Sequence, residues 1–342
     1  MAVDEPIRFA AVGLNHGHVY AMIDLLRNAG AELAGFHSRE DDLAKGFSKQ
    51  HPDVQRADSM DRIFQDESIQ VVVSAAIPDE RASIGCAAMR HGKDVMMDKP
   101  GATTIEQLKE LRQVQSETGR IYSVCYAERL DQRATVAAER MVRNGAIGKV
   151  IQTIGLGPHR PALHTRPEWF FDRERYGGIL VDIGSHQFDQ FLAFTNSTTA
   201  TIVASRAGNS HHPQHPGFDD FGDAMLQGDS GAAGYIRLDW FTPDGLPTWG
   251  DGRLFVLGSE GTIEVRKYVD VAGRPGDSHV YLVDRTGMHY IDCKDEPLQY
   301  GPRFLDDVRN RTETAMTQQH CFAATELALR AQVQAVEFKH AG

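Results

Sequence analysis

The chain is poor in cysteine, in positive charge and in long apolar runs. Its cysteines are too far apart for a C-x-x-C pair, which indicates neither a zinc ribbon nor a disulfide framework; they are Cys86, Cys125, Cys293 and Cys321. Asp and Glu outnumber Lys and Arg by 47 to 36, which disfavours a nucleic-acid partner. No run reaches the ~18 apolar residues of a membrane span. We expect a reduced, cytoplasmic protein that binds neither nucleic acid nor membrane.

A length of 342 residues favours two domains over one. Apolar runs that end in glycine or proline alternate with helical patterns over residues 1–126. This alternation predicts a doubly wound parallel sheet, a Rossmann-type domain, with its ligand at the carboxyl ends of the strands. The expected strands are 7–13, 31–38, 71–78, 93–100 and 121–130, and the expected helices are 19–30, 41–51, 79–92 and 104–119.

Residues 127–342 have a different pattern, in which period-two alternation follows a first helix. It predicts an α+β domain with a large, mostly antiparallel open sheet and flanking helices. The stretch 304–338 is expected to be helical and to pack back against the first domain. The expected strands are 150–157, 199–208, 221–228, 233–241, 253–259, 262–269, 278–285 and 288–293, after a helix at 135–150.

The turn after the first strand is a degenerate form of the G-x-G-x-x-G motif of dinucleotide-binding folds. Gly13 is kept, Leu14, Asn15 and His16 follow it, and Gly17 comes directly after His16. We expect this turn to approach a pyrophosphate, with Asn15 capping the next helix and both polar side chains donating to phosphate. An ordinary strand-to-helix turn explains the same residues.

The end of the second strand bears on the choice between NAD and NADP. An NAD site has a carboxylate here for the ribose 2′-hydroxyl, whereas this chain has His37, then Ser38 and Arg39. A hydroxyl and a guanidinium suit a 2′-phosphate, so the sequence favours NADP. The alternative is that Arg39 pairs with the acidic run 40–42.

The fourth strand ends in Asp98, Lys99 and Pro100. A lysine before proline cannot continue the ladder, so its ammonium is expected to project over the cofactor crevice. Asp98, Ala76 and Pro78 are the other residues expected to line that crevice. The alternative for Lys99 is a solvated surface residue.

The apolar stretch 177–192 carries Asp182, His186 and Asp189 at spacings of four and three. On a helix these side chains share one face. An imidazole beside carboxylates can form the wall of an active site, or the histidine can belong to a packed helix. Two roles are open for Asp189, to anchor the helix by hydrogen bonds or to contact substrate.

Together these motifs resemble the Gfo/Idh/MocA family of nicotinamide-dependent sugar and polyol oxidoreductases over nearly the whole chain. The family's E-K-P is D-K-P at 98–100, and its G-G followed by D-x-x-x-H-x-x-D lies within 177–189. The stretch 124–131 is similar to the family's V-G-F-x-R-R-Y strand, with Tyr126 and Arg129 matching and Glu128 departing. Arg81 stands where the family usually has histidine, and residues 257–265 resemble its G-x-x-G-x-x-x-V hairpin.

The resemblance implies hydride transfer between a nicotinamide and a hydroxyl of a sugar, polyol or related compound. It also implies a catalytic trio of Lys99, Asp182 and His186, with His186 as general base, Asp182 holding the imidazole or a sugar hydroxyl, and Lys99 polarising the reacting oxygen. A homodimer or homotetramer through the second sheet is implied as well. The alternatives are a redox-neutral glycosidase or lyase that retains NAD, and a cofactor-sensing regulatory protein without turnover.

Two segments of the second domain bear on the substrate pocket. Residues 157–178 supply His159, Arg166 and Trp169, which with Tyr126 we expect to contact substrate by stacking and hydrogen bonding. Residues 209–223 cluster His211, His212 and His215 near two aspartates. A metal site is conceivable there, but the prolines favour a solvent-exposed loop, and we expect no metal.

Overall fold

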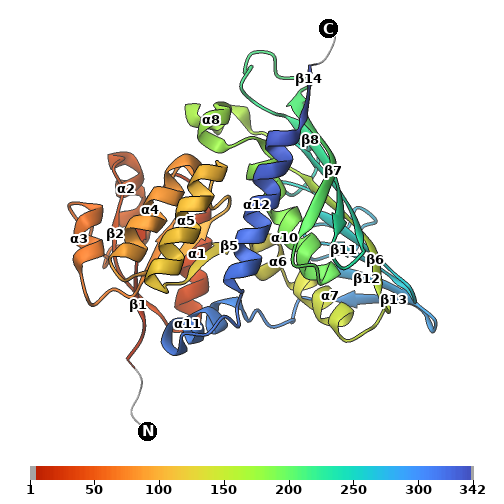
Figure 1. The fold of residues 1–342 in the computed structure, drawn as a ribbon, viewed down its shortest axis with the longest axis horizontal. Helices are drawn as coiled ribbons and strands as arrows, with labels where there is room; N and C mark the ends of the chain where they lie inside the picture. Colours follow the sequence, from red (N-terminus) through yellow and green to blue (C-terminus); the bar gives the residue numbers. More distant parts are fainter. Residues whose placement is uncertain (1–4, 340–342) are drawn as a thin grey trace. The chain divides into compact units, whose positions relative to one another are not determined.

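The computed structural model describes residues 5–339, and these fold into two compact units. Unit 1 contains the described residues up to Cys125 together with Gln299–Phe322. Unit 2 contains Tyr126–Leu298 together with the described residues from Ala323 onward. Each unit has its own sheet (Figure 1). The division at 126/127 into functional domains stays a prediction.

Unit 1 has the predicted Rossmann-type sheet, with five parallel strands in the order β2-β1-β3-β4-β5. The strand order reverses between β1 and β3, and ligands of such sheets bind at this point. The strands are β1 (Arg8–Val12), β2 (Glu32–His37), β3 (Val71–Ser74), β4 (Asp94–Asp98) and β5 (Tyr122–Cys125). The helices between them are α1 (His18–Asn28), α2 (Asp41–Gln50), α3 (Met60–Gln65), α4 (Pro78–Arg90) and α5 (Ile105–Thr118).

Local sequence explains most of these elements. Strands β3, β4 and β5 are buried throughout, as apolar runs in a covered parallel sheet should be. Helix α4 begins at Pro78, whose missing N–H is not needed at a helix start. Helix α5 begins where the Thr104 hydroxyl accepts from the Gln107 N–H at 3.1 Å, and it ends at Gly119 in the left-handed conformation.

The last part of unit 1 comes from the C-terminal third of the chain. Helix α11 (Tyr300–Asn310) packs on α1, and the following Arg311 donates two hydrogen bonds to the Asp94 carboxylate at the start of β4. The prediction of one helical stretch over 304–338 is wrong in detail. Helix α11 ends at Asn310, α12 (Gln318–Gln334) follows, and residues Val336–Lys339 form strand β14.

Unit 2 contains a sheet of nine strands in the order β13-β12-β11-β10-β6-β9-β8-β7-β14. Most neighbours are antiparallel, as predicted, whereas β6 with β9 and β7 with β14 are parallel. Its strands are β6 (Val150–Pro158), β7 (Ala200–Asn209), β8 (Phe221–Gly228), β9 (Ala233–Asp239), β10 (Arg253–Gly258), β11 (Thr262–Arg266), β12 (His279–Asp284), β13 (Gly287–Asp292) and β14.

Helices cover one face of this sheet and leave the other face open (Figure 1). They are α6 (Ala127–Leu130), α7 (Arg133–Arg143), α8 (Arg173–Tyr176), α9 (Ile179–Asp182) and α10 (Gly184–Thr195). Helix α10 lies close to β6, where a Cβ at Gly155 would stand 2.4 Å from the Gln187 Oε1. A larger residue at Gly155 would therefore displace the Gln187 side chain.

Two expected elements differ in the structure. The strand expected over 121–130 ends at Cys125, and Ala127–Leu130 turn into the short helix α6. The stretch 177–192 is two helical segments, α9 and α10, joined at Ile183, which keeps a right-handed helical conformation. Among the described residues, none of the helices combines the length and the apolar character that crossing a lipid bilayer demands.

Alanine substitution should change the stability in opposite directions at two helical glycines of unit 1. A Cβ at Gly85 would lie 2.6 Å from the ring of Tyr122, which is fixed by burial and by its hydrogen bond to the Gly101 carbonyl. Gly46 has nothing within 4 Å of that position. We expect Gly85→Ala to lower the free energy of unfolding by about 1–3 kcal/mol. Gly46→Ala should raise it by about 0.5–1 kcal/mol, because alanine loses less backbone entropy in a helix.

Urea unfolding of the two variants beside the parent protein measures both effects. Equal shifts of one sign for both variants would contradict the packing described around Gly85.

Candidate active site

The turn after β1 has the geometry that a pyrophosphate needs. Gly13 has a φ of +74°, and a Cβ there would stand 2.5 Å from the Ala76 Cβ, so no other residue fits. Within the described residues, the backbone N–H groups of Leu14, Asn15 and Gly17 donate to no protein acceptor. Free amides that precede a helix form an anion site. The turn therefore fits a dinucleotide although its motif is degenerate.

Asn15 does not cap the next helix as predicted, while donation to phosphate by Asn15 and His16 stays a prediction. Helix α1 begins after Gly17 without a side-chain cap, and the Asn15 Nδ2 donates instead to the Glu40 Oε1 at 2.9 Å. The backbone N–H of His16 donates to the Ala75 carbonyl at 2.9 Å. Asn15 therefore fixes the Glu40 carboxylate by a hydrogen bond, a role that the local sequence pattern did not predict.

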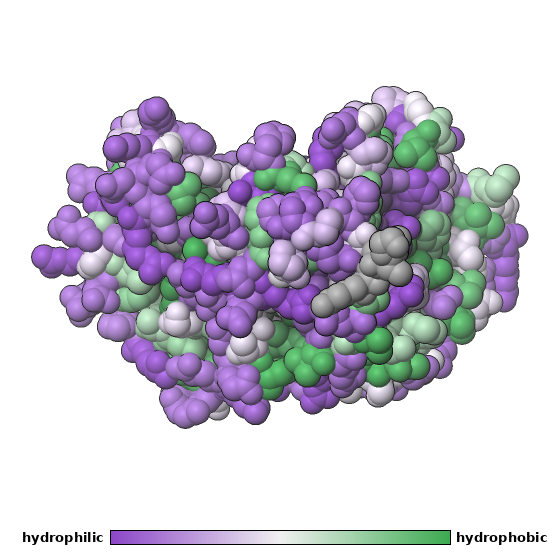
Figure 2. All heavy atoms as spheres, turned by 90° about the horizontal axis from the view of Figure 1, so that it is seen from above, coloured by the Kyte–Doolittle hydropathy of each residue, from purple (hydrophilic) through white to green (hydrophobic). Residues whose placement is uncertain are grey.

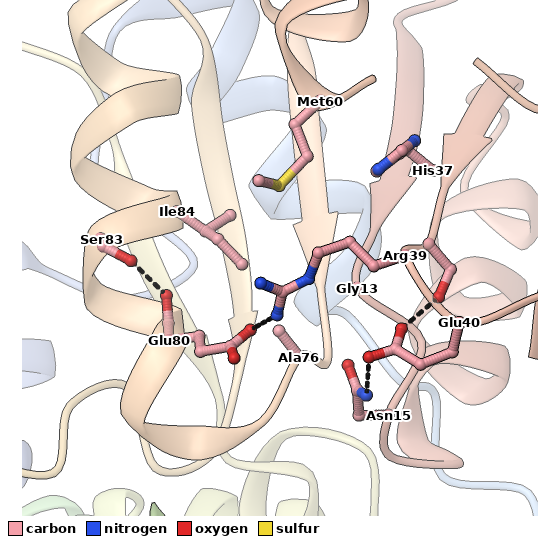
Figure 3. Close-up of a pocket in the computed structure, with 11 residues that line it drawn as sticks. Gly13, Asn15, His37, Arg39, Glu40, Met60, Ala76, Glu80, Ser83 and Ile84 are labelled. Atoms are coloured by element: carbon pink, nitrogen blue, oxygen red, sulfur yellow. Dashed lines mark hydrogen bonds and ion pairs between the residues drawn. The ribbon is translucent and has the colours of Figure 1, made fainter. Parts of the chain in front are cut away.

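A pocket lies beyond the ends of β1, β2 and β3 (Figure 3). The predicted residues Gly13, Asn15, Ser38, Arg39 and Ala76 line it. The remaining residues that line it are His37, Glu40, Met60, Glu80, Ser83 and Ile84. The structure thus brings five of the ten expected cofactor residues together, and His16, Asp98 and Lys99 are not among the residues that line this pocket. Pro78 begins α4 and Leu14 is buried, and neither lines this pocket.

The charges of the pocket correct the alternative pairing given for Arg39. Arg39 does not pair with the run 40–42 but with Glu80 of α4. Glu40 places a carboxylate in the pocket although none stands at the usual position. Burial by itself would raise the pKa of Glu40, but hydrogen bonds from Asn15 and from Ser38, the latter at 2.7 Å, outweigh it and lower that pKa. The Glu40 carboxylate is thus held in its ionised form.

Asp98 of the D-K-P motif is the centre of a buried polar cluster. Arg81 lies 3.0 Å from its Oδ2, the His18 Nδ1 lies 2.9 Å from its Oδ1, and the Lys99 N–H donates to that Oδ1 at 2.8 Å. Burial would raise the pKa of Asp98, but Arg81 and then His18 oppose it and hold the pKa well below the usual range. His16, 3.5 Å away, has its pKa lowered by burial and by His18.

This cluster fixes the backbone around Lys99. The Arg81 guanidinium donates to the carbonyls of Ala76 and Lys99, at the ends of β3 and β4. Arg81 and Asp98 are both departures from the family motifs, and they pair with each other, so the longer cation reaches the shorter carboxylate. Lys99 itself is buried, and its peptide bond to Pro100 is cis.

The same cluster contains side chains that could bind a metal. His16, His18 and Asp98 bring one ligand atom each within 4.8 Å of one another. However, Arg81 already neutralises Asp98 at 3.0 Å, and a divalent cation there would face that guanidinium. We therefore assign the group as a hydrogen-bonded support rather than a metal centre.

In unit 2, the helix α10 carries His186 and Asp189, and Asp182 ends α9. Asp189 is fully buried and accepts two hydrogen bonds of 2.7 Å from Arg129, so it anchors the helix, one of the two roles left open for it. The buried His186 imidazole has Tyr126 edge-on, with 6.4 Å between ring centroids. Helix anchoring and ring packing thus fix the orientation of this part of the chain.

A buried ion pair, which the sequence argument missed, lies beside this helix. The Lys267 Nζ is 2.5 Å from the Glu128 Oε2, and the Gln187 Nε2 donates to the same oxygen at 2.9 Å. Burial would raise the pKa of Glu128, but Lys267 first, then His186 and His159, lower it. Glu128 was recognised only as a departure from the family pattern. Its partner is 139 residues away in sequence, so nothing local identifies it.

The predicted substrate residues form an aromatic and basic wall. The Arg166 guanidinium lies over the rings of Phe170 and Trp240, 4.5 and 5.2 Å from their centroids. Burial lowers the pKa of Arg166, and the nearby Asp182 opposes this shift. His159 also packs against Trp240, with 5.2 Å between centroids. The structure thus groups Arg166, His159 and Asp182, while Trp169 packs edge-on against Phe170.

The loop 209–223 is more ordered than predicted. His212 is buried and its Nδ1 lies 2.8 Å from the Asp220 Oδ2, which also accepts from the His211 N–H at 2.7 Å. His215 stacks on Phe171 with 3.7 Å between centroids. The expectation of a solvent-exposed loop holds for His211 alone of these histidines, because the aspartates that follow fold the loop back.

Comparison with known proteins agrees with this architecture. Residues 7–126 match the model of an oxidoreductase family with an NAD-binding Rossmann fold, and residues 135–264 match that of the Gfo/Idh/MocA C-terminal domain. A crystal structure described as that of an oxidoreductase from Erwinia carotovora atroseptica SCRI1043 is 48% identical, with a TM-score of 0.95 over 97% of this chain and 99% of that chain.

The chain belongs to the Gfo/Idh/MocA family. Curated members from Bacillus subtilis (strain 168) include an NAD⁺-dependent scyllo-inositol 2-dehydrogenase, 26% identical over 72% of this chain and 70% of that protein. An NADP⁺-dependent scyllo-inositol 2-dehydrogenase is also 26% identical, over 49% of this chain and 46% of that protein. The predicted fold and nicotinamide cofactor are confirmed, and members use either nucleotide. The roles of single residues stay predictions.

The buried pair of Glu128 and Lys267 yields a test of its packing. Glu128→Gln leaves the Lys267 ammonium buried without a counter-charge, which should lower the free energy of unfolding by about 3–5 kcal/mol. In the double variant Glu128→Gln/Lys267→Met no charge is left to desolvate, so most of the loss should return. Urea unfolding measures both.

Glu110→Gln serves as the control, because Glu110 pairs with Arg90 at 3.0 Å on an exposed surface and should matter by less than about 1 kcal/mol. A double variant as unstable as Glu128→Gln would contradict the assignment.

Proposed function

We propose that this chain transfers a hydride between a nicotinamide and a hydroxyl-bearing carbon of a sugar, polyol or related compound. The relatives named as inositol dehydrogenases support the substrate class. The observation that carries the proposal is the D-K-P cluster, in which Arg81, His18 and Asp98 fix Lys99 at the end of β4. Side-chain support of this kind is what a reacting group needs to be held in place.

The proposed chemistry assigns one role to each member of the trio. As the alcohol is oxidised, its C–H bond breaks and the hydrogen leaves as a hydride, with both bonding electrons. A bound nicotinamide would accept this hydride. The hydroxyl proton passes to His186 as general base, and a carbonyl remains. Lys99 stabilises the charge that develops on the oxygen. Asp182 holds the imidazole or a second hydroxyl. The joint action of the three rests on the family resemblance.

The wall of unit 2 suits a polyhydroxylated substrate. The Arg166 guanidinium lies against aromatic rings and donates from Nε to the Pro161 carbonyl at 2.9 Å, and its other N–H groups can donate to hydroxyl or carboxylate oxygens. Asp182 is partly exposed and can accept from a hydroxyl. Tyr126, His159 and Trp169 are proposed to complete the contacts. A cytoplasmic location fits the four free thiols but stays a prediction.

We further infer that a second copy of this chain covers the open face of the unit 2 sheet. One cross-strand row there consists of Leu257, Thr262 and Val283, in which two apolar side chains flank a threonine. Leu257 and Val283 are 43% and 44% exposed, and apolar patches of this kind mark interfaces. Figure 2 shows apolar surface among polar residues in its right-hand part, where Figure 1 draws this sheet.

Sedimentation velocity tests the second copy. The parent protein should sediment as a dimer or tetramer, and Leu257→Glu/Val283→Glu should sediment as a monomer because two carboxylates would be buried without partners. Val333→Glu, on the exposed side of α12, is the control and should keep the parent's mass. A parent protein that is monomeric at all concentrations tested would contradict the inference.

The role of Lys99 is tested by Lys99→Ala. We expect kcat on a polyol substrate to fall by about 10²-fold or more. The Kd for nucleotide, measured by quenching of tryptophan fluorescence, should change by less than about fivefold, because Lys99 is proposed to act on the reacting oxygen. An unchanged kcat under saturating substrate would refute this role.

The same preparation discriminates the alternatives. Nucleotide that survives purification and is released only on denaturation would favour the redox-neutral glycosidase or lyase. Exchangeable nucleotide with hydride transfer supports the dehydrogenase, and exchangeable nucleotide without turnover on any polyol would favour the sensor.

A further inference from the structure

Three charged side chains line the nucleotide pocket of unit 1. Arg39 follows β2, Glu80 lies in the first turn of α4, and Glu40 is the neighbour of Arg39 in sequence. Figure 3 shows the Arg39 side chain extending across the pocket to the Glu80 carboxylate, while Glu40 turns the other way towards Asn15. Arg39, the one cation among the described residues that line this pocket, is therefore held by an anion from another element.

The Arg39–Glu80 pair is accessible, unlike the pairs that support Lys99. The Arg39 side chain is 59% exposed and that of Glu80 is 24% exposed, so solvent screens their attraction. A pair of this kind can exchange partners. A doubly charged phosphate is a stronger partner for a guanidinium than one carboxylate.

We propose that Glu80 is a specificity-determining residue that competes with the 2′-phosphate of NADP for Arg39. The inference rests on the proposed function, since it concerns the nucleotide of that reaction. To bind NADP, Arg39 must leave Glu80, and both carboxylates of the pocket then face the phosphate. NAD has no such group, so it leaves the pair intact.

Glu40 strengthens this discrimination. Its carboxylate is ionised, and hydrogen bonds from Asn15 and Ser38 fix its position. A carboxylate has lone pairs for about four hydrogen bonds, so it can also accept from a ribose hydroxyl. It would repel a 2′-phosphate. With Glu80 in place the pocket has one cation and two anions, and the removal of Glu80 makes the balance neutral.

Nucleotide titration of Glu80→Gln tests the inference. The Kd for NADPH, measured by fluorescence of the bound nucleotide, should become about five- to tenfold lower, the gain expected for a guanidinium released to a phosphate. The Kd for NADH should stay within about twofold. Glu110→Gln is the matched control, because it removes the carboxylate of another exposed Arg–Glu pair of unit 1 outside this pocket. It should change neither Kd.

A second comparison asks whether the effect acts through Arg39. In an Arg39→Ala background, Glu80→Gln should lower the NADPH Kd by a smaller factor than in the parent protein, because no guanidinium is released and only the repulsion between Glu80 and the phosphate is removed. An undiminished gain in that background would overturn the competition for Arg39. A melting temperature for each variant confirms that the mutants are folded.

The outcomes separate this inference from the proposed function. If the parent protein binds neither NADH nor NADPH, the proposed function falls. If it binds either one and Glu80→Gln shifts both nucleotides equally, or shifts neither, the proposed function stands and the role of Glu80 is overturned.

Discussion

The buried charge of Asp98 is the constraint on which the arrangement of unit 1's site depends. A carboxylate that loses its water must find donors of comparable strength. Arg81, His18 and the Lys99 N–H supply them, and Arg81 also reaches the carbonyls at the ends of β3 and β4. One ionised group thus ties the start of α1, the first turns of α4 and the end of β4 to each other. Because Asp98 accepts from the Lys99 N–H and Arg81 donates to the Lys99 carbonyl, both sides of this backbone are held.

Unit 2 uses the same physical device in a different setting. The buried Glu128 carboxylate accepts hydrogen bonds from Lys267, which directly follows β11, and from Gln187 of α10. The Asp189 carboxylate accepts from Arg129. These pairs dock the helix that carries His186 against the sheet, where Gly155 allows close approach. In both units, therefore, the residues proposed for catalysis lie next to charged side chains that are paired inside the protein. The Arg39–Glu80 pair of the pocket is instead near solvent and can exchange partners.

Sequence patterns predicted the elements whose causes are local. Apolar runs, period-two alternation and helix-ending glycines were enough for both sheets and most helices, and Gly13 marked the nucleotide turn because only glycine fits there. The errors have a common cause. Residues 127–130 form a helix, and residues 336–339 a strand, because partners from distant parts of the chain supply the contacts. The alternative pairing of Arg39 with residues 40–42 was wrong for the same reason, since its partner Glu80 lies in the distant helix α4.

The sequence by itself determined the fold class, the family and the residue types available for hydride transfer, because these are carried by periodicity and by motifs a few residues long. Only the tertiary structure decided which charges meet. The partners of Asp98, of Glu128 and of Arg39 come from 17, 139 and 41 positions away. Such pairings depend on how strand ends and helices converge in space, and electrostatic attraction over a few ångströms has no signature in the spacing of residues along the chain.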